Sequence, residues 1–373
     1  MTLEQQFFLQ ILSDHINERE TIIPESVDWT VLHEMAKKHQ VEAVVYKQTK
    51  KTDFSSAYGM AVYNYINRKA DLTDLFSSFT GKYFLVKGPV IAEKYPVPAL
   101  RTMGDVDIIV RPADKEQLHE LLLTKGFSAN KSDREWTYQK KNAHYEVHDR
   151  LVYEVQRKTE KQTEFFNSCW DYINDNALDW NFHFIFLIFH LRKHFVNQGV
   201  GFRQFLDIAV AIKNIDLDWE WIANKLKEIE MYTFAAKVTS LCHDWFETET
   251  PIDTELDAIF SDEATALIFE NGVFGFDNKE NQKNVVENYV RQHGKSSMIS
   301  RFLSDVFLSY NDMVKLPEYH FLKNKKWLLP AGWIYRIVLK IKQHKLGKLR
   351  THYFITNKEI TERESHLRKW GIQ

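Results

Sequence analysis

Apolar residues recur every three to four positions along the N-terminal part of the chain, as they do in amphipathic helices. In residues 3–16 they include Phe7 and Leu12. Asp28 precedes the next such stretch, and an Asp there accepts hydrogen bonds from the first backbone N–H groups of a helix. The pattern predicts an N-terminal helical region over residues 1–80, with helices at 3–16, 28–39, 41–46 and 56–76.

Alternation replaces helical spacing between residues 81 and 155, where short apolar runs are separated by turn residues. One amphipathic helix is expected at 112–125, because Gly126 follows it at a typical C-cap position. The alternation predicts strands at 83–86, 105–110, 135–139 and 144–148. These elements favour a small mixed β-sheet core over residues 81–155.

Helical spacing returns in residues 156–315, which we expect to form an all-helical domain. A polar connector at 171–179 comes first. The predicted helices are 182–196, 202–214, 219–230, 233–246, 264–269 and 296–310. The expected fold class is therefore α+β, with N-terminal helices, a small mixed sheet and a helical C-terminal domain.

The last segment, residues 316–373, differs from the rest in charge. From Tyr319 to Asn357 every charged side chain is Lys or Arg, with Trp327 and Trp333 among them. One interpretation is a solvated amphipathic helix whose aromatic face packs on the protein body. The alternatives are contact with nucleic acid, with nucleotide phosphates or with an anionic membrane surface.

Composition narrows the class of protein. A chain of 373 residues is long enough for two or three domains, and 44% hydrophobic residues exclude global disorder. A net charge of −2 does not indicate a nucleic-acid binder. Cys169 and Cys242 lie too far apart in sequence to suggest a disulfide framework or a zinc site. The N-terminus lacks a signal-type segment, and the richest apolar run, 182–191, is too short to span a bilayer. We expect a soluble cytoplasmic protein without a transmembrane segment.

Two carboxylates open the strand predicted at 105–110. Because side chains alternate along a strand, Asp105 and Asp107 are expected on one face and Val106 on the other. Adjacent carboxylates repel each other unless a cation neutralises them, and hard oxygen ligands suit Mg²⁺ or Mn²⁺. Glu146, on a later predicted strand, adds a third acid. The alternative is ordinary turn or capping chemistry for a Gly-Asp pair.

Together these motifs resemble the nucleotidyltransferase superfamily of the DNA polymerase β type, and more closely its branch of bacterial proteins called uncharacterised nucleotidyltransferases. The motifs that carry the resemblance are 85–88, 101–107, 125–127, 145–148 and 190–194, with Arg203 and Asp207. The resemblance implies an enzyme that moves NMP from an NTP, with ATP as the expected donor, to a hydroxyl of a small molecule or protein. It also implies a mechanism with two Mg²⁺ ions.

The resemblance also implies roles for single residues. It makes Asp105, Asp107 and Glu146 the catalytic residues and the metal ligands. Glu146 is also the candidate base, and His148 on the same face competes for that role. The residues implied to bind nucleotide are Lys87, Gly88, Arg101 and Gly104.

Each further candidate has a structural alternative. Lys87 and Gly88 can be a strand-end lysine and a turn glycine, and Arg101 can form an ion pair that holds its loop. Arg203 and Asp207 either contact substrate or pair within one helix, since they lie a turn apart. The residues of a candidate cleft are His148, His190, Lys193, His194, Arg203 and Asp207.

Pro89 departs from the superfamily pattern, which has Ser or Gly at this position. Proline has no N–H group to donate to a phosphate. If it starts a short helix, the amides beyond it are expected to remain free for the phosphates, with Lys87 replacing the missing hydroxyl contact. The departure also favours a second hypothesis, an inactive binding or regulatory module with this fold. A third is a nucleic-acid-binding protein that uses the basic C-terminal segment, which we do not favour.

Overall fold

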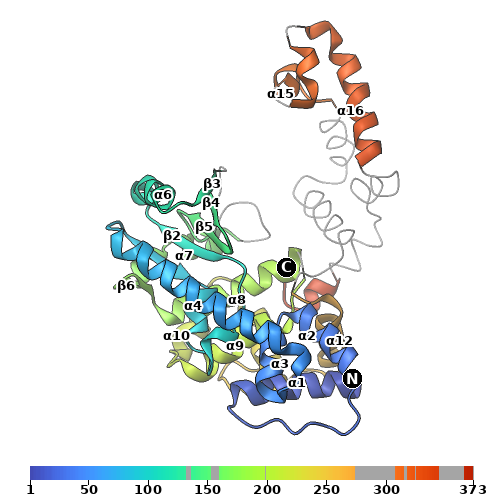
Figure 1. The fold of residues 1–373 in the computed structure, drawn as a ribbon. Helices are drawn as coiled ribbons and strands as arrows, with labels where there is room; N and C mark the ends of the chain where they lie inside the picture. Colours follow the sequence, from blue (N-terminus) through green and yellow to red (C-terminus); the bar gives the residue numbers. More distant parts are fainter. Residues whose placement is uncertain are drawn as a thin grey trace. The chain divides into compact units, whose positions relative to one another are not determined.

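The computed structural model describes residues 1–131, 136–152, 159–197, 199–273, 307–314, 317–323, 325–343 and 365–372. The chain forms two compact units. The first comprises residues 1–195, 199–275 and 369–372, and the second includes the described residues of 307–343. All of the candidate site residues lie in the first unit (Figure 1).

The first unit contains a five-stranded mixed sheet (Figure 1). Its strands are β1 (Tyr83–Val86), β2 (Val106–Val110), β3 (Ser128–Lys131), β4 (Trp136–Lys140) and β5 (Ala143–His148). Their order is β1-β2-β5-β4-β3, with β2 and β5 parallel and the other neighbours antiparallel. The predicted small mixed sheet is confirmed, although the sequence analysis missed β3.

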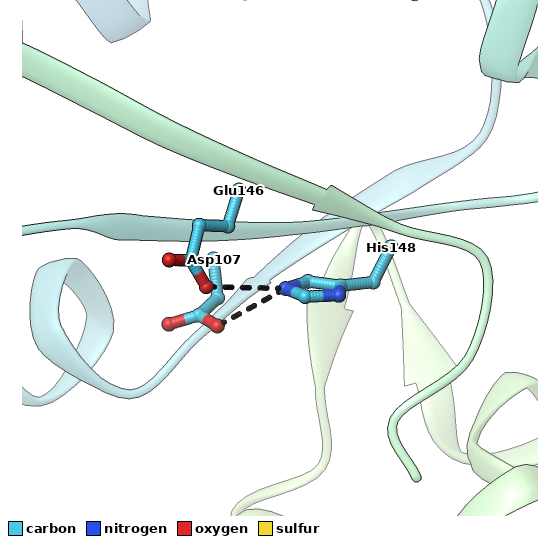
Figure 2. A group of neighbouring side chains, drawn as sticks. All are labelled: Asp107, Glu146 and His148. Atoms are coloured by element: carbon cyan, nitrogen blue, oxygen red, sulfur yellow. Dashed lines mark ion pairs between the residues drawn. The ribbon is translucent and has the colours of Figure 1, made fainter. Parts of the chain in front are cut away.

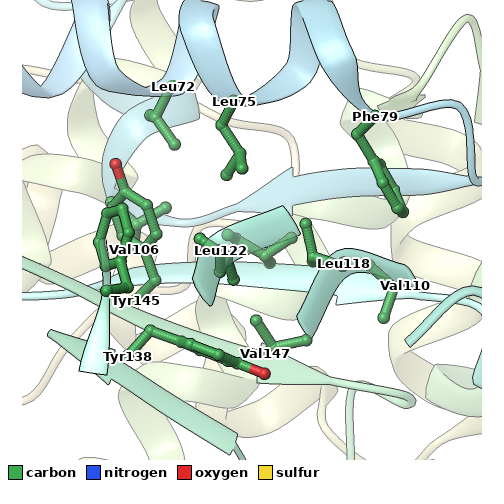
Figure 3. Packing of buried hydrophobic residues seen from close by; sticks show 12 residues of the cluster. Leu72, Leu75, Phe79, Val106, Val110, Leu118, Leu122, Tyr138, Tyr145 and Val147 are labelled. Atoms are coloured by element: carbon green, nitrogen blue, oxygen red, sulfur yellow. The ribbon is translucent and has the colours of Figure 1, made fainter. Parts of the chain in front are cut away.

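One face of this sheet is buried beneath α4 (Ser55–Ser78) and α6 (Lys115–Thr124). Figure 3 shows Leu72 and Leu75 of α4, and Phe79 directly after it, pointing toward the sheet. The strand residues of this core are Val106, Ile108, Val110, Tyr138, Tyr145 and Val147. Since alternate residues of a strand face opposite sides, Asp107 and Glu146 project from the other face.

The predicted N-terminal helices are confirmed as α1 (Leu3–Ile16), α2 (Trp29–His39), α3 (Glu42–Thr49) and α4. Their ends follow from local hydrogen bonds. The Asp28 carboxylate accepts from the N–H groups of Thr30 and Val31, at 2.9 and 3.2 Å, as predicted. Short turns complete this half: η1 (Thr52–Phe54), α5 (Gly88–Ala92), η2 (Pro98–Leu100) and η3 (Pro112–Asp114).

Helices dominate the rest of the first unit, as predicted. They are α7 (Glu160–Asn167), η4 (Cys169–Tyr172), α8 (Trp180–Asn197), α9 (Phe202–Asn214), α10 (Trp219–Glu228), α11 (Tyr232–Phe246) and α12 (Ala258–Asn271). The polar connector contains a small hairpin of β6 (Ile173–Asn174) and β7 (Ala177–Leu178). The predicted helix at 296–310 lies almost wholly outside the described residues.

The second unit holds the first part of the basic, aromatic segment. Its described elements are α15 (Tyr310–Val314), η5 (Pro317–Leu322), η6 (Lys326–Leu328) and α16 (Leu329–Gln343). A small core of Met313, Tyr319 and Leu322 packs against Trp333, whereas Trp327 is 76% exposed. Across the described parts of both units, no helix combines the length and apolar character needed to cross a membrane.

Candidate functional site

Asp107 and Glu146 lie side by side on the face of the sheet that α4 and α6 leave uncovered. The parallel register of β2 and β5 pairs Asp107 with Glu146, and the antiparallel register of β1 and β2 pairs Val86 with Asp107. His148 lies two residues beyond Glu146, so it projects from the same face. Nearer β1 this face is covered, because the Phe84 ring packs edge-on against Trp170 at 5.0 Å.

Three ion-pair contacts join this group. The Lys87 Nζ lies 2.7 Å from Asp107 Oδ2. The His148 Nε2 lies 3.4 Å from Asp107 Oδ1 and 3.6 Å from Glu146 Oε2, and Figure 2 shows its ring facing both carboxylates. One ligand atom each from Asp107, Glu146 and His148 can be chosen so that all lie within 4.8 Å of one another. This spacing allows all three atoms to contact one ion.

The charges in this group stabilise one another. Burial favours the neutral form of Asp107, but Lys87 and His148 outweigh burial and hold its pKa well below the usual range. The hydrogen bond from His148 lowers the pKa of Glu146 against the opposing effect of burial. Burial lowers the pKa of His148, yet the two carboxylates raise it more. Both acids are therefore ionised at neutral pH while His148 tends to be protonated.

A strained turn positions Lys87. Its backbone has φ 58° and ψ −121°, a conformation that favours glycine. The Lys87 N–H donates to His183 Nε2 at 3.0 Å. His183 on α8 is fully buried, and burial lowers its pKa to about 3, so the ring is neutral and can accept. Sequence reasoning missed this role of His183, whose one signal was a polar residue inside an apolar helix.

The turn after Lys87 leaves fewer free amides than expected. Pro89 does lie in the first turn of α5, as predicted. However, the N–H groups of Val90 and Ile91 donate to the Lys87 carbonyl oxygen at 3.1 and 2.9 Å. The expectation that the amides beyond Pro89 remain free for phosphates is therefore wrong. Gly88 lies in a tightly packed position, since a Cβ there would lie 3.2 Å from Arg101 Nη1.

Arg101 forms a buried bidentate ion pair with Asp207 of α9. Its Nε and Nη2 lie 3.0 and 2.6 Å from the two carboxylate oxygens, and the Tyr95 hydroxyl donates to the same carboxylate at 2.8 Å. Arg203 instead donates to Gln40 and to the Thr102 carbonyl oxygen. The predicted pairing of Arg203 with Asp207 within one helix is wrong, because Arg101 occupies that carboxylate. For Arg101 the geometry agrees with the alternative of an ion pair that holds its loop.

Asp105 and Gly104 lie in the loop directly before β2, where Asp105 is half-buried and Gly104 exposed. Asp105 is not part of the group formed by Asp107, Glu146 and His148. Its carboxylate acts electrostatically on three arginines: Arg68, Arg101 and Arg203. Its role as a metal ligand, and that of Gly104 in nucleotide binding, stay predictions.

The histidines of α8 lie near this site. The charge of Lys87 acts on both His183 and His190, so the helix side that carries them is close to the Lys87 ammonium. His190 and His194 contact each other through their Nε2 atoms at 2.9 Å, whereas Lys193 is exposed. Burial lowers the pKa of His190 well below its usual value. A cleft formed by these residues stays a prediction.

Comparison with known proteins assigns the chain to a family. A family model described as "Uncharacterised nucleotidyltransferase" matches residues 25–247, more than half of the chain. The chain belongs to this family. The matched part of the chain contains every candidate site residue from Lys87 to Asp207. No curated protein and no solved structure matched the chain. Family membership supports a general role in nucleotidyl transfer and the use of divalent metal.

Proposed function

We propose that the protein transfers NMP from an NTP, with ATP as the expected donor, to a hydroxyl of a small molecule or a protein. The observation that carries the proposal is the Asp107–Glu146–His148 group on the face of the sheet opposite α4 and α6, within a chain of this family. The acceptor and the two-ion mechanism are parts of the proposal that rest on the resemblance to the superfamily.

The donor atoms fit a divalent cation. Two ionised carboxylates and one imidazole nitrogen suit Mn²⁺ better than Mg²⁺, which prefers oxygen ligands alone. Asp107, Glu146 and His148 would hold such an ion, and Asp105 would supply a further oxygen if its loop allows. A bound ion supplies positive charge that stabilises the phosphates during transfer.

The remaining chemistry falls to the side chains of the chain itself. Glu146 is ionised at neutral pH, so its carboxylate is able to accept a proton from the acceptor hydroxyl, the role of base that the resemblance implies. Without a bound ion, the raised pKa of His148 favours its protonated form, which orients the two carboxylates; an ion bound at Nε2 would displace that proton. Lys87 supplies a positive charge at the end of β1, where it can contact an anionic phosphate.

A non-catalytic binding module is the second candidate function, and one observation favours it. The amides of Val90 and Ile91 are bonded to Lys87, and Pro89 has none, so this turn offers little backbone for a triphosphate. Nucleic-acid binding would depend on the basic C-terminal segment. Residues 344–357 of that segment are outside the described part of the chain.

Transfer of label decides between enzyme and binding module. The protein is incubated with each α-labelled NTP, Mn²⁺ or Mg²⁺ and a cell extract, and transferred label is sought in proteins and small molecules. We expect transfer that requires the metal, is lost in Asp107→Asn and is retained in Lys225→Gln, a surface control on α10. No transfer from any NTP, together with no rise in melting temperature with NTP and metal, would favour the binding module.

A further inference from the structure

A second pocket lies at the end of the sheet, away from the Asp107–Glu146–His148 group. It has a volume of about 210 Å³ and is formed by one side of α4 and the turn between β4 and β5. The residues that line it are Tyr63, Asn64, Asn67, Arg68, Asp71, Lys140, Lys141, Asn142 and Ala143. None of them is a candidate site residue of the proposed transferase.

The pocket carries an excess of positive charge. Arg68, Lys140 and Lys141 contribute three cations, whereas Asp71 is the one carboxylate in its lining. Within the described part of the chain, no carboxylate lies within 4 Å of any of these three cations. The asparagine amides of the lining can also donate to an oxygen ligand. The pocket therefore offers several donors and little negative charge of its own.

Arg68 is the central cation of this pocket. It is half-buried, and its Nη2 donates to the Met103 carbonyl oxygen at 3.0 Å. Burial lowers the pKa of Arg68, and the nearby negative groups do not fully offset that effect. A guanidinium that is partly removed from water without a carboxylate partner gains from a bound anion. Arg68 also lines a neighbouring pocket beside Pro89 and Met103, so ligands can reach it from two sides.

A second observation concerns a buried hydroxyl beside the pocket, on Tyr145, which is not itself one of the lining residues. The Tyr145 side chain is fully buried, and its hydroxyl has no hydrogen-bond partner. Figure 3 shows this hydroxyl pointing toward α4. Burial and, to a smaller extent, the charge of Asp71 raise the pKa of Tyr145, whereas the charge of Arg68 lowers it, so the hydroxyl lies near two lining side chains. Buried polar groups are rarely left unpaired in folded proteins.

We propose that this pocket binds a small anion, namely the phosphate or carboxylate group of a small molecule, through Arg68, Lys140 and Lys141. The volume lies below that of pockets for drug-sized ligands, about 300–1,000 Å³. The anionic end of a ligand therefore occupies it rather than a whole nucleotide. The site is separate from the metal group, since Ala143 precedes Glu146 by three strand residues, or roughly 10 Å.

The experiment measures anion binding in the absence of divalent metal. Isothermal titration at low ionic strength uses inorganic phosphate in one arm and malonate in the other, and the arm that binds identifies the class. Arg68→Gln is expected to weaken binding about tenfold or more, as for loss of a charge-assisted hydrogen bond. Lys141→Gln, at an exposed turn, should also weaken it, whereas Lys225→Gln should not.

Two results would overturn the proposal. One is that neither phosphate nor malonate binds at millimolar concentration. The other is binding that both Arg68→Gln and Lys141→Gln leave unchanged while their melting temperatures stay normal. Asp107→Asn separates this site from the transferase site, because it should abolish metal-dependent NTP binding and leave metal-free anion binding intact. Failure of nucleotidyl transfer would therefore not affect the outcome.

Discussion

Replacing Arg101 by Met distinguishes its two roles, a structural ion pair and a nucleotide contact. The side chains of Arg101 and Asp207 are 8% and 7% exposed, so both charges are largely removed from water. Without the guanidinium, the Asp207 carboxylate stays buried, and among the described residues the Tyr95 hydroxyl is its remaining side-chain hydrogen-bond donor. Removing one partner of a buried pair costs about 3–5 kcal/mol. Arg101→Met should therefore lower the free energy of unfolding by about that amount.

Urea unfolding followed by tryptophan fluorescence measures this change. The double variant Arg101→Met, Asp207→Leu removes both charges and should recover most of the loss, because apolar residues of similar volume replace buried pairs at little cost. The matched control is Lys161→Met, whose pair with Glu230 is 60% and 53% exposed. Loss of this exposed pair should leave the urea midpoint nearly unchanged.

Two results would contradict a structural role of the Arg101–Asp207 ion pair. If Arg101→Met keeps the stability of the parent protein but loses affinity for NTP with metal, the side chain is a nucleotide contact and the ion pair contributes little. A double variant less stable than either single variant would show that the Asp207 carboxylate is stabilised by other groups. Either outcome would refute the reasoning from burial.

Three further predictions concern single groups. Tyr145→Phe should stabilise the protein by about 1–3 kcal/mol in urea unfolding, because it removes an unpartnered buried hydroxyl. Tyr138→Phe should instead destabilise the protein, because it loses the 2.9 Å contact with His119 Nδ1. Equal effects of the two variants on stability would contradict this prediction. Lys87→Gly should be more stable than Lys87→Ala by roughly 1 kcal/mol, because φ is positive there, and the opposite order would exclude backbone strain. Burial lowers the pKa values of His15 and His39 to about 4 and 3. Their folded pKa values lie below the unfolded value, so the stability that they contribute above about pH 6.5 is lost as the pH falls. At about pH 5 the loss should be about 2 kcal/mol for each histidine. Equal urea midpoints at neutral pH and at pH 5 would refute this prediction.

Local signals explain which elements the sequence predicts well. The observed bounds of α1 and α9 agree with the predicted ranges, because apolar spacing and capping residues act within a few positions. The strand β3 has no such signal, since its four residues, Ser128–Lys131, are all exposed. It is a strand only because β4 pairs with it, and a pairing partner is a property of the folded chain.

In the candidate site, too, local patterns predict some residue positions and not others. Strand alternation predicts that Asp107 and Glu146 face the same side, and the register of β2 and β5 places them next to each other. The loop before β2 is not bound by strand geometry, so alternation gives no reliable position for Asp105. The partners of Arg101 and Lys87 come from α9 and α8, 106 and 96 residues away in the sequence. No local pattern identifies contacts at such separations.

Charge balance relates residues that lie far apart in the sequence. Two ionised carboxylates on adjacent strands are stable only when positive charge lies beside them, and here Lys87 and His148 provide it. A divalent cation that binds Asp107 must therefore compete with the Lys87 ammonium for Oδ2. Displaced from Asp107, the same ammonium becomes available to an incoming phosphate at the end of β1. Under the proposed function, Lys87 would then link binding of the metal to binding of the nucleotide, and this link would follow from charge neutrality rather than from any motif.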